Sequence, residues 1–164
     1  LLNYHQVNQA NRLGSRFTNV NNTYVNWDGD ATRGINSADY LIDGVPIHVM
    51  SVHLSIEPDA SVNRTSEIQK IIEEMDKYPI VICGGDFNTF SENELEPLKA
   101  KYTVLNTGDF GDFNTWKGSS SWAYRCLDNI VIKGLSASMV TVGDYKISDH
   151  EPLSAVLNFR TVIK

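Results

Sequence analysis

Long apolar runs, a disulfide framework and an excess of basic residues are all missing from this chain of 164 residues. No apolar run approaches the roughly 20 residues that a membrane-spanning helix needs, so the sequence predicts no transmembrane segment. The two cysteines, Cys83 and Cys126, lie in or at the start of apolar runs and are predicted to be buried strand thiols. This pattern does not decide between a cytoplasmic and a secreted protein.

The shortage of positive charge limits the partners that the chain suits. The 14 basic residues are outnumbered by 20 acidic ones, and the net charge is −6. This balance argues against a broad basic surface for nucleic acid and favours small phosphoesters, lipid headgroups or a limited nucleic-acid contact. It does not exclude a nuclease, because a metal ion and a local patch can hold a phosphate inside an acidic protein.

Repeats, linkers and low-complexity tracts are absent as well, so residues 1–164 are predicted to form a single domain. Two helices are predicted. The first spans about 62–77 and has one apolar face made of Ile68, Ile71, Ile72 and Met75. The second opens with a capping box at Ser91 and runs to about Lys99.

Strands are predicted around these helices. Residues 38–54 hold two β-rich runs joined by Asp43-Gly44, a strong two-residue hairpin signal. Residues 1–37 are rich in Asn and are predicted to be mostly loop, with one strand near Phe17–Val20. The remaining predicted strands are a buried strand at 79–83, a hairpin over 113–133, and two final strands at 139–142 and 152–159. Strands mixed with two helices predict a layered α/β or α+β sandwich.

The motif GGDFN at 84–88 follows the buried strand. Two glycines let the backbone turn sharply and approach a ligand closely. The Asp86 carboxylate can bind a divalent cation or take a proton from water, and the Asn88 amide, two residues on, points to the same side of an extended chain and can bind a phosphate oxygen. The alternative is a Gly-Gly-Asp turn with an Asn cap.

The motif SDHEPL at 148–153 puts a carboxylate and an imidazole side by side. Asp149 suits metal binding, and His150 can hold or protonate a phosphate; the alternative is a surface loop pair. Asp128 lies inside the apolar run LDNIVI, where an unpaired carboxylate is costly. We expect Asp128 to pair with a histidine and thereby to raise the pKa of that histidine. The less favoured alternative is that Asp128 lies on an edge strand and faces water.

Histidines and aromatics supply further candidates. His53 ends the run IHVMSV and is a candidate for the site, while His48 faces the opposite side and is predicted to pack or to lie on the surface. Arg64 is predicted to lie on a solvated helix face, with bonds to the His53 loop as the alternative. Trp116 and Trp122, near the 117–121 tip, can contact a base, sugar or lipid chain, or simply pack across strands.

The order of four motifs resembles the endonuclease/exonuclease/phosphatase family, which includes deoxyribonuclease I, exonuclease III and bacterial sphingomyelinases. These motifs are SVHL (51–54), GGDFN (84–88), CLDNIVI (126–132) and SDHEPL (148–153). The resemblance covers about Ser15 to Phe159. It implies a deoxyribonuclease I-like α/β sandwich, with two sheets packed face to face and helices outside. It also implies an ester-bond hydrolase that uses a metal for in-line attack of water on phosphorus.

The resemblance implies roles for the candidate residues. Asp86 would activate water or bind metal, and Asp149 would be a metal ligand. The polar site implies Mg²⁺ or Mn²⁺, because carboxylate and amide oxygens suit hard cations. Substrates would be nucleic acid, a phospholipid headgroup or a small organic phosphate.

The remaining roles concern the phosphate. Asn88 would orient it, and His150, oriented by Asp128, would contact it at the scissile position. His53 would be a second histidine facing the phosphate and would assist the leaving group.

One departure from the family bears on the extent of the chain. The family has an early Asn and a metal-binding Glu upstream of the position of Ser15, whereas the first glutamate here is Glu57. We therefore expect the C-terminal two-thirds of a catalytic domain without its N-terminal strands, the missing segment belonging to a longer chain or a separate one. The alternative is a degenerate relative that binds a phosphate-bearing ligand or partner without cleaving it. Asn129 is a smaller departure, since a larger aromatic or basic residue is usual there.

Overall fold

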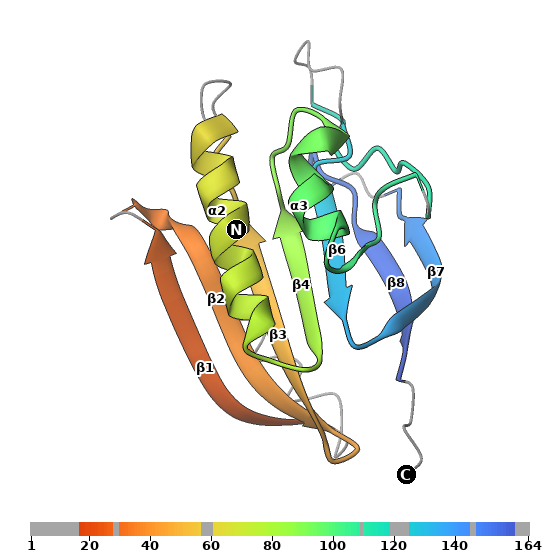
Figure 1. Cartoon of the computed structure of the whole chain (residues 1–164). Helices are drawn as coiled ribbons and strands as arrows, with labels where there is room; N and C mark the ends of the chain where they lie inside the picture. The colour runs from red at the N-terminus through yellow and green to blue at the C-terminus, as the bar shows by residue number, and fades with distance from the viewer. Residues whose placement is uncertain are drawn as a thin grey trace.

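A computed structural model of the chain describes residues 17–27, 30–56, 61–108, 110–118, 125–144 and 147–159 (Figure 1). The elements within these ranges are β1 (Phe17–Trp27), β2 (Asp30–Ile42), β3 (Val45–His53), α2 (Ser61–Asp76), β4 (Val81–Asp86), the 3₁₀ helix η2 (Glu92–Leu95), α3 (Glu96–Lys99), β5 (Thr103–Val104), β6 (Asp128–Lys133), β7 (Ser136–Val142) and β8 (Leu153–Asn158).

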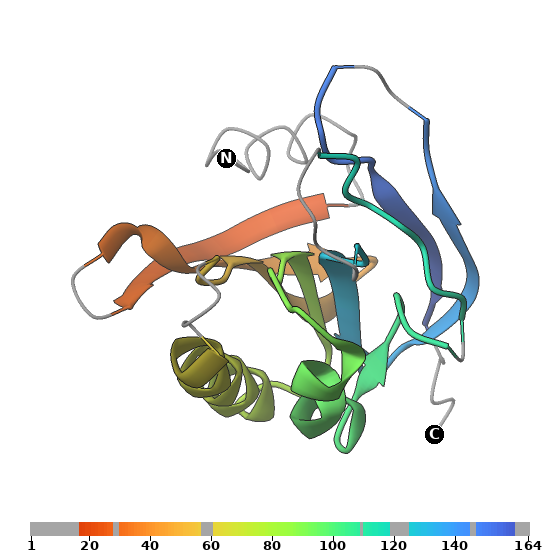
Figure 2. The same cartoon turned by 90° about the horizontal axis from the view of Figure 1, so that it is seen from above.

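Two sheets organise these elements. One has six strands in the order β1-β2-β3-β4-β6-β5, and the other is the β7–β8 ribbon. The β3–β4 pair is parallel and is connected through α2, whereas every other neighbouring pair is antiparallel. Seen from above, α2 and α3 cover one face of the six-stranded sheet, and the ribbon lies at its β6 side (Figure 2). These layers form the α/β sandwich that the sequence predicts.

The core lies between the helices and the six-stranded sheet. Met50 and Val52 point from β3 toward α2, where the predicted apolar face of the helix is buried against them. Val81 and Cys83 of β4 complete this layer, and burial raises the pKa of the Cys83 thiol to about 12. Cys83 and Cys126 are both buried and free, as predicted. Successive strand residues alternate between faces, so His53 and Asp86 belong to the face without helices.

The turn between β2 and β3 confirms the hairpin signal. Asp43 and Gly44 both adopt positive φ, at 52° and 80°. Two consecutive left-handed residues give the turn whose twist matches that of the flanking strands. The predicted strand at 79–83 is also present, as β4, and no helix in the described part of the chain is long and apolar enough to cross a membrane.

Three predictions of local structure were wrong. Residues 21–27 and 30–37 are not loop but belong to β1 and β2, because the pairing of β1 with β2 and of β2 with β3 outweighs their weak β propensity. The capping box does not form, since the Ser91 side chain makes no cap bond and Glu94 Oε1 instead accepts from the Phe90 N–H at 2.7 Å. Of the hairpin predicted over 113–133, the described residues contain only β6 as a strand; the Thr115 N–H donates to the Arg125 carbonyl at 3.0 Å, Trp116 bridges to His150, and residues 119–124 of the predicted tip lie outside the described residues.

Candidate active site

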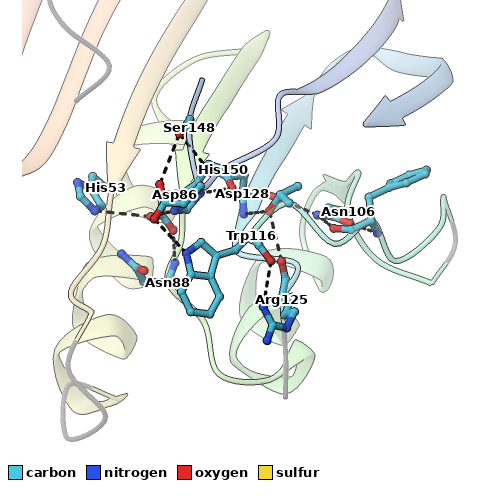
Figure 3. A network of polar contacts seen from close by, with 12 residues as sticks. His53, Asp86, Asn88, Asn106, Trp116, Arg125, Asp128, Ser148 and His150 are labelled. Carbon is cyan, nitrogen blue, oxygen red and sulfur yellow. Dashed lines mark hydrogen bonds and ion pairs between the residues drawn. The ribbon is translucent and has the colours of Figure 1, made fainter. Parts of the chain in front are cut away.

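Three strand ends bring three polar side chains into one row. His53 ends β3, Asp86 ends β4 and Asp128 begins β6. His53 pairs with Asp86 in the parallel register, and Asp86 pairs with Asp128 in the antiparallel one. Neighbouring strands are about 4.8 Å apart, so residues paired on one face become side-chain neighbours. Figure 3 shows these three residues together with His150.

Asp86 lies between two imidazoles. Its Oδ2 is 3.7 Å from His53 Nε2 and 3.9 Å from His150 Nε2. The side chain of Asp86 is 19% exposed, that of His53 45% and that of His150 30%, so water and a ligand can reach all three. Both distances exceed hydrogen-bond length, so neither ring nitrogen is hydrogen-bonded to Asp86 Oδ2 at these separations.

His150 and Asp128 form the closest pair of the site. His150 Nδ1 is 2.7 Å from Asp128 Oδ2, and an ionised carboxylate only accepts, so Nδ1 donates. This hydrogen bond raises the pKa of His150 above its ordinary 6.5; burial opposes the shift, and the charges of Asp128, Asp86 and Asp149 reinforce it. The expected histidine partner of Asp128 is therefore confirmed, with the expected direction of the pKa.

The backbone of this pair is tied down as well. The Asp128 N–H donates to Thr115 Oγ1 at 2.9 Å, and the His150 N–H donates to Ser148 Oγ at 3.1 Å. Asn106, which is fully buried, donates from Nδ2 to the Asp128 carbonyl at 2.9 Å. Nothing in the sequence around Asn106 indicates this role. The only indication is its partner: the Asn106 backbone N–H donates to Asn129 Oδ1 at 2.9 Å, and Asn129 is a polar residue inside an apolar strand.

Asn88 does not follow the predicted extended geometry. Its φ is 47°, so its side chain does not simply repeat the direction of Asp86. Its N–H donates to Asp86 Oδ1 at 2.9 Å, and its Nδ2 donates to the Leu54 carbonyl at 2.9 Å. Asn88 is buried beside the row, where it fixes one oxygen of Asp86 and links the loop after β4 to the end of β3.

Of the two glycines in the motif, Gly85 is the one whose conformation requires glycine. Its φ is 153°, and a Cβ there would lie 2.0 Å from the Val52 carbonyl oxygen. A Cβ at Gly84 would meet only the Asn129 carbonyl oxygen, at 3.8 Å. The close approach therefore serves the β3–β4 pairing that aligns His53 with Asp86.

Asp149 and Trp116 border the row. The Trp116 indole Nε1 lies 3.4 Å from Asp149 Oδ2, and the backbone of Trp116 forms a β-bridge with His150 (Figure 3). The Arg125 guanidinium lies 5.2 Å from the Trp116 ring centroid. Trp122 lies outside the described residues.

The oxygen donors at the site fit a hard cation. Asp86 and Asp149 offer carboxylates, and such ligands suit Mg²⁺ or Mn²⁺. The described residues alone, however, contain no group of three or more His, Cys, Asp or Glu side chains that could hold a metal ion.

Two other expectations have clear outcomes. His48 is buried and stacked on Tyr78 at a centroid distance of 3.7 Å, which confirms it as a packing residue. The solvated position predicted for Arg64 was wrong, because Arg64 is 1% exposed. The first turn of α2 packs against the loops after β3 and β4, and the long side chain reaches between them.

Among known sequences, no family model matches the chain. The uncharacterized protein YbhP of Escherichia coli (strain K12) is 27% identical over an aligned length of 172 that covers 94% of this chain. The match covers 65% of YbhP, so this chain spans slightly less than two thirds of that relative's length.

Solved structures share the fold. TDP2 of D. rerio, in a complex with a single-strand DNA product, superposes with a TM-score of 0.73 and 18% identity, covering 88% of this chain and 69% of that one. The inositol polyphosphate 5-phosphatase domain of SpSynaptojanin, with inositol (1,4)-bisphosphate and a calcium ion, gives a TM-score of 0.63 at 16% identity, covering 85% and 54%. These likenesses confirm the deoxyribonuclease I-like α/β sandwich.

Proposed function

We propose that this chain carries catalytic groups of a metal-dependent phosphoester hydrolase, a phosphodiesterase, nuclease or phosphatase that directs water in line at phosphorus. The observation that carries the proposal is that one carboxylate of the row, Asp86, lies between the imidazoles of His53 and His150. Phosphoryl transfer needs a base for water, positive charge near the phosphate oxygens and an acid for the leaving group. Two imidazoles and a carboxylate supply these three functions.

His150 is the group that holds the scissile phosphate. Its Nδ1 is engaged by Asp128, so its Nε2 is directed toward Asp86 and the space beside it. Because its pKa is raised, the ring keeps its proton to higher pH than a free imidazole does. A cationic N–H that is already oriented stabilises the charge that develops on a phosphate oxygen.

Asp86 is the group that receives the proton of the attacking water. The Asn88 N–H donates to its Oδ1, and its Oδ2 faces the two imidazoles, where the attacking water or a cation would bind. His53, on the other side of Oδ2 and nearly half exposed, is placed to protonate the leaving oxygen. Asn88, which is buried, supports this arrangement by fixing Asp86 Oδ1, and only the second hydrogen of its Nδ2 would serve a phosphate oxygen.

A bound Mg²⁺ or Mn²⁺ would supply Lewis-acid polarisation of the phosphate and a lower pKa for water. Asp149 and Asp86 would hold the ion. We propose that its remaining protein ligand comes from outside the described residues, either in a longer natural chain or in a separate chain that binds this one.

The net charge of the chain and its candidate tryptophans indicate the substrate class. With a net charge of −6, the chain suits a small organic phosphate, a phospholipid headgroup or a short stretch of nucleic acid. The single-strand DNA product on TDP2 and the inositol bisphosphate on the 5-phosphatase domain support a phosphoester. Trp116 and Trp122 would contact the group next to the phosphate.

The test is hydrolysis of bis-para-nitrophenyl phosphate by the protein at its natural length, with and without Mg²⁺ or Mn²⁺. We expect metal-dependent turnover that Asp86→Asn abolishes, and that Asp112→Asn, a change to an exposed carboxylate away from the row, leaves intact. Turnover that ignores the metal or survives Asp86→Asn would refute the proposal.

A second function is favoured by one observation, the lack of a three-ligand metal group among the described side chains. On this alternative the chain binds a phosphate-bearing ligand without cleaving it. Saturable binding of inorganic phosphate without metal-dependent turnover, when the chain is assayed at its natural length, would establish the alternative.

A further inference from the structure

We propose that Arg64 is a positioning residue that holds His53 in place by clamping the two loops behind the row. This inference rests on the proposed function, since it assigns Arg64 to the reaction only through His53. The described contacts of Arg64 are with Ser55, Phe90 and Glu94, which follow the ends of β3 and β4. Arg64 acts through the backbone that follows His53.

The guanidinium of Arg64 is buried and bound on several sides. Its Nε donates to Glu94 Oε2 at 2.6 Å, and its Nη1 donates to the Ser55 carbonyl at 3.1 Å. The Phe90 ring centroid lies 4.7 Å from its central carbon. A buried cation costs solvation, and a planar guanidinium offsets this cost best when its fork meets several fixed acceptors.

These partners belong to two different loops. Ser55 follows β3, whereas Phe90 and Glu94 follow β4. Glu94 bridges the guanidinium to the second loop, because its other oxygen accepts from the Phe90 N–H at 2.7 Å. Arg64 therefore links the loop that leaves His53 to the loop that leaves Asp86.

A glutamate one turn along the helix completes the clamp on Ser55. Glu67 Oε2 accepts from the Ser55 N–H at 3.0 Å, and its Oε1 accepts from Ser55 Oγ at 2.7 Å. Arg64 and Glu67 are three residues apart and thus on one face of α2. Ser55 lies two residues after His53. Side chains of α2 thereby bind both its backbone N–H and its carbonyl.

The same short segment is held from β4. The Leu54 N–H donates to the Asp86 carbonyl at 2.9 Å, and the Leu54 carbonyl accepts from Asn88 Nδ2 at 2.9 Å. Every backbone polar group from Leu54 N–H to the Ser55 carbonyl is therefore bound. His53 Nε2 stands 3.7 Å from Asp86, and this separation depends on where the strand ends. Small displacements of a reacting group cost activity steeply, about 100-fold for 1 Å.

The experiment is a double-mutant cycle between Arg64→Met and His53→Asn, measured as kcat and KM for bis-para-nitrophenyl phosphate. We expect Arg64→Met to lower kcat on the order of tenfold with KM nearly unchanged. In the His53→Asn background the same change should lower kcat less than about twofold, because residues that act as a unit are not additive. Losses of kcat that multiply in the double variant would overturn the proposal.

Stability is measured alongside, to separate positioning from folding. Urea unfolding should give additive changes for the two substitutions, since their side chains share no contact in the described structure. Arg64→Lys retains the charge without the fork; we expect it to fold and to retain part of the kcat lost in Arg64→Met. A Lys variant with full kcat would count against the clamp. Lys101→Met is the control for loss of a paired cation, because Lys101 binds Asp76, the last residue of α2, at the end of the helix opposite Arg64.

Imidazole NMR resonances test the clamp even if the chain does not turn over substrate. Arg64→Met should shift the ring signals of His53 and leave those of His48 in place. Unmoved His53 signals would refute the clamp itself. Shifted His53 signals in a chain without turnover would instead retain the clamp and reject the hydrolase proposal.

Discussion

At the residue scale, the chemistry of this chain depends on how each polar group is held. Asp128 lies in an apolar strand, and its carboxylate is paired with His150 at 2.7 Å. Asp86 has one oxygen bound by the Asn88 N–H and the other directed between two rings. Groups held in this way lose little freedom when substrate binds, which is the main contribution of a protein to phosphoryl transfer.

Replacing Asp128 should change the titration of His150. Asp128→Asn removes the hydrogen bond that raises the pKa of His150, so this pKa should fall toward 6.5. Activity that needs the cationic ring should then be lost at lower pH, and kcat/KM at pH 7.5 should fall at least about tenfold. An NMR titration of His150 and a pH profile of kcat/KM measure the two effects, with Asp112→Asn as the control.

The Asp128–His150 pair also makes the unfolding free energy depend on pH. Because the folded pKa of His150 is raised, the pair stabilises the fold fully below pH 6.5 and loses this effect as pH rises through the folded pKa. The difference in unfolding free energy between the native chain and Asp128→Asn should therefore be larger at pH 6 than at pH 9. An equal difference at both values would show that the pairing does not link folding to protonation.

Some residues of the site were predictable from sequence and others were not. A carboxylate inside an apolar strand predicts a partner, and Asp128 has one. Arg64 sits at the start of an amphipathic helix, where exposure is the ordinary outcome, and only the loops that pack on that turn make it buried. Asn88 takes a left-handed conformation because its side chain is needed at Leu54, a contact that no spacing in the sequence encodes.

At the element scale, the β3–β4 pair is the feature that assembles the site. Parallel strands end at one edge, which is why His53 and Asp86 meet although they are far apart in sequence. Local signals found the helix face and the Asp43-Gly44 turn, because periodicity and turn chemistry are short-range. They missed most of β1 and β2, because an Asn-rich strand forms only when a neighbour supplies its ladder.

The two glycines of GGDFN should differ sharply on substitution. Gly85→Ala would push a Cβ against the Val52 carbonyl at a strained φ and should lower the unfolding free energy by more than about 2 kcal/mol. Gly84→Ala meets only an ordinary contact and should stay within about 1 kcal/mol. Urea unfolding measures both, and similar losses at the two positions would show that the close approach to β3 is not what requires glycine.

At the scale of the whole molecule, the two sheets are unequally covered. The six-stranded sheet buries a continuous core beneath α2 and α3. The β7–β8 ribbon has no buried residue in either strand, and Met139 and Val156 are 58% and 48% exposed. A two-stranded ribbon of this kind has little stability of its own.

Hydrogen exchange should reveal this inequality. Amides of β7 and β8 should exchange at least about 100-fold faster than those of Val81, Cys83 and Val131, because local opening of the ribbon exposes no core. Mass spectrometry of peptides from the two sheets provides the measurement. Equal protection would mean that the ribbon opens only when the whole molecule unfolds.

The central place of β4 has one more implication, which concerns insertions and deletions. Its neighbours β3 and β6 each contribute a member of the row through their alignment with it. Removing one residue from β4 would turn Asp86 toward the helices and bring an apolar neighbour to the edge in its place. The chain should therefore tolerate changes of length in its loops far better than in this strand, because the register that packs the core also aligns His53, Asp86 and Asp128.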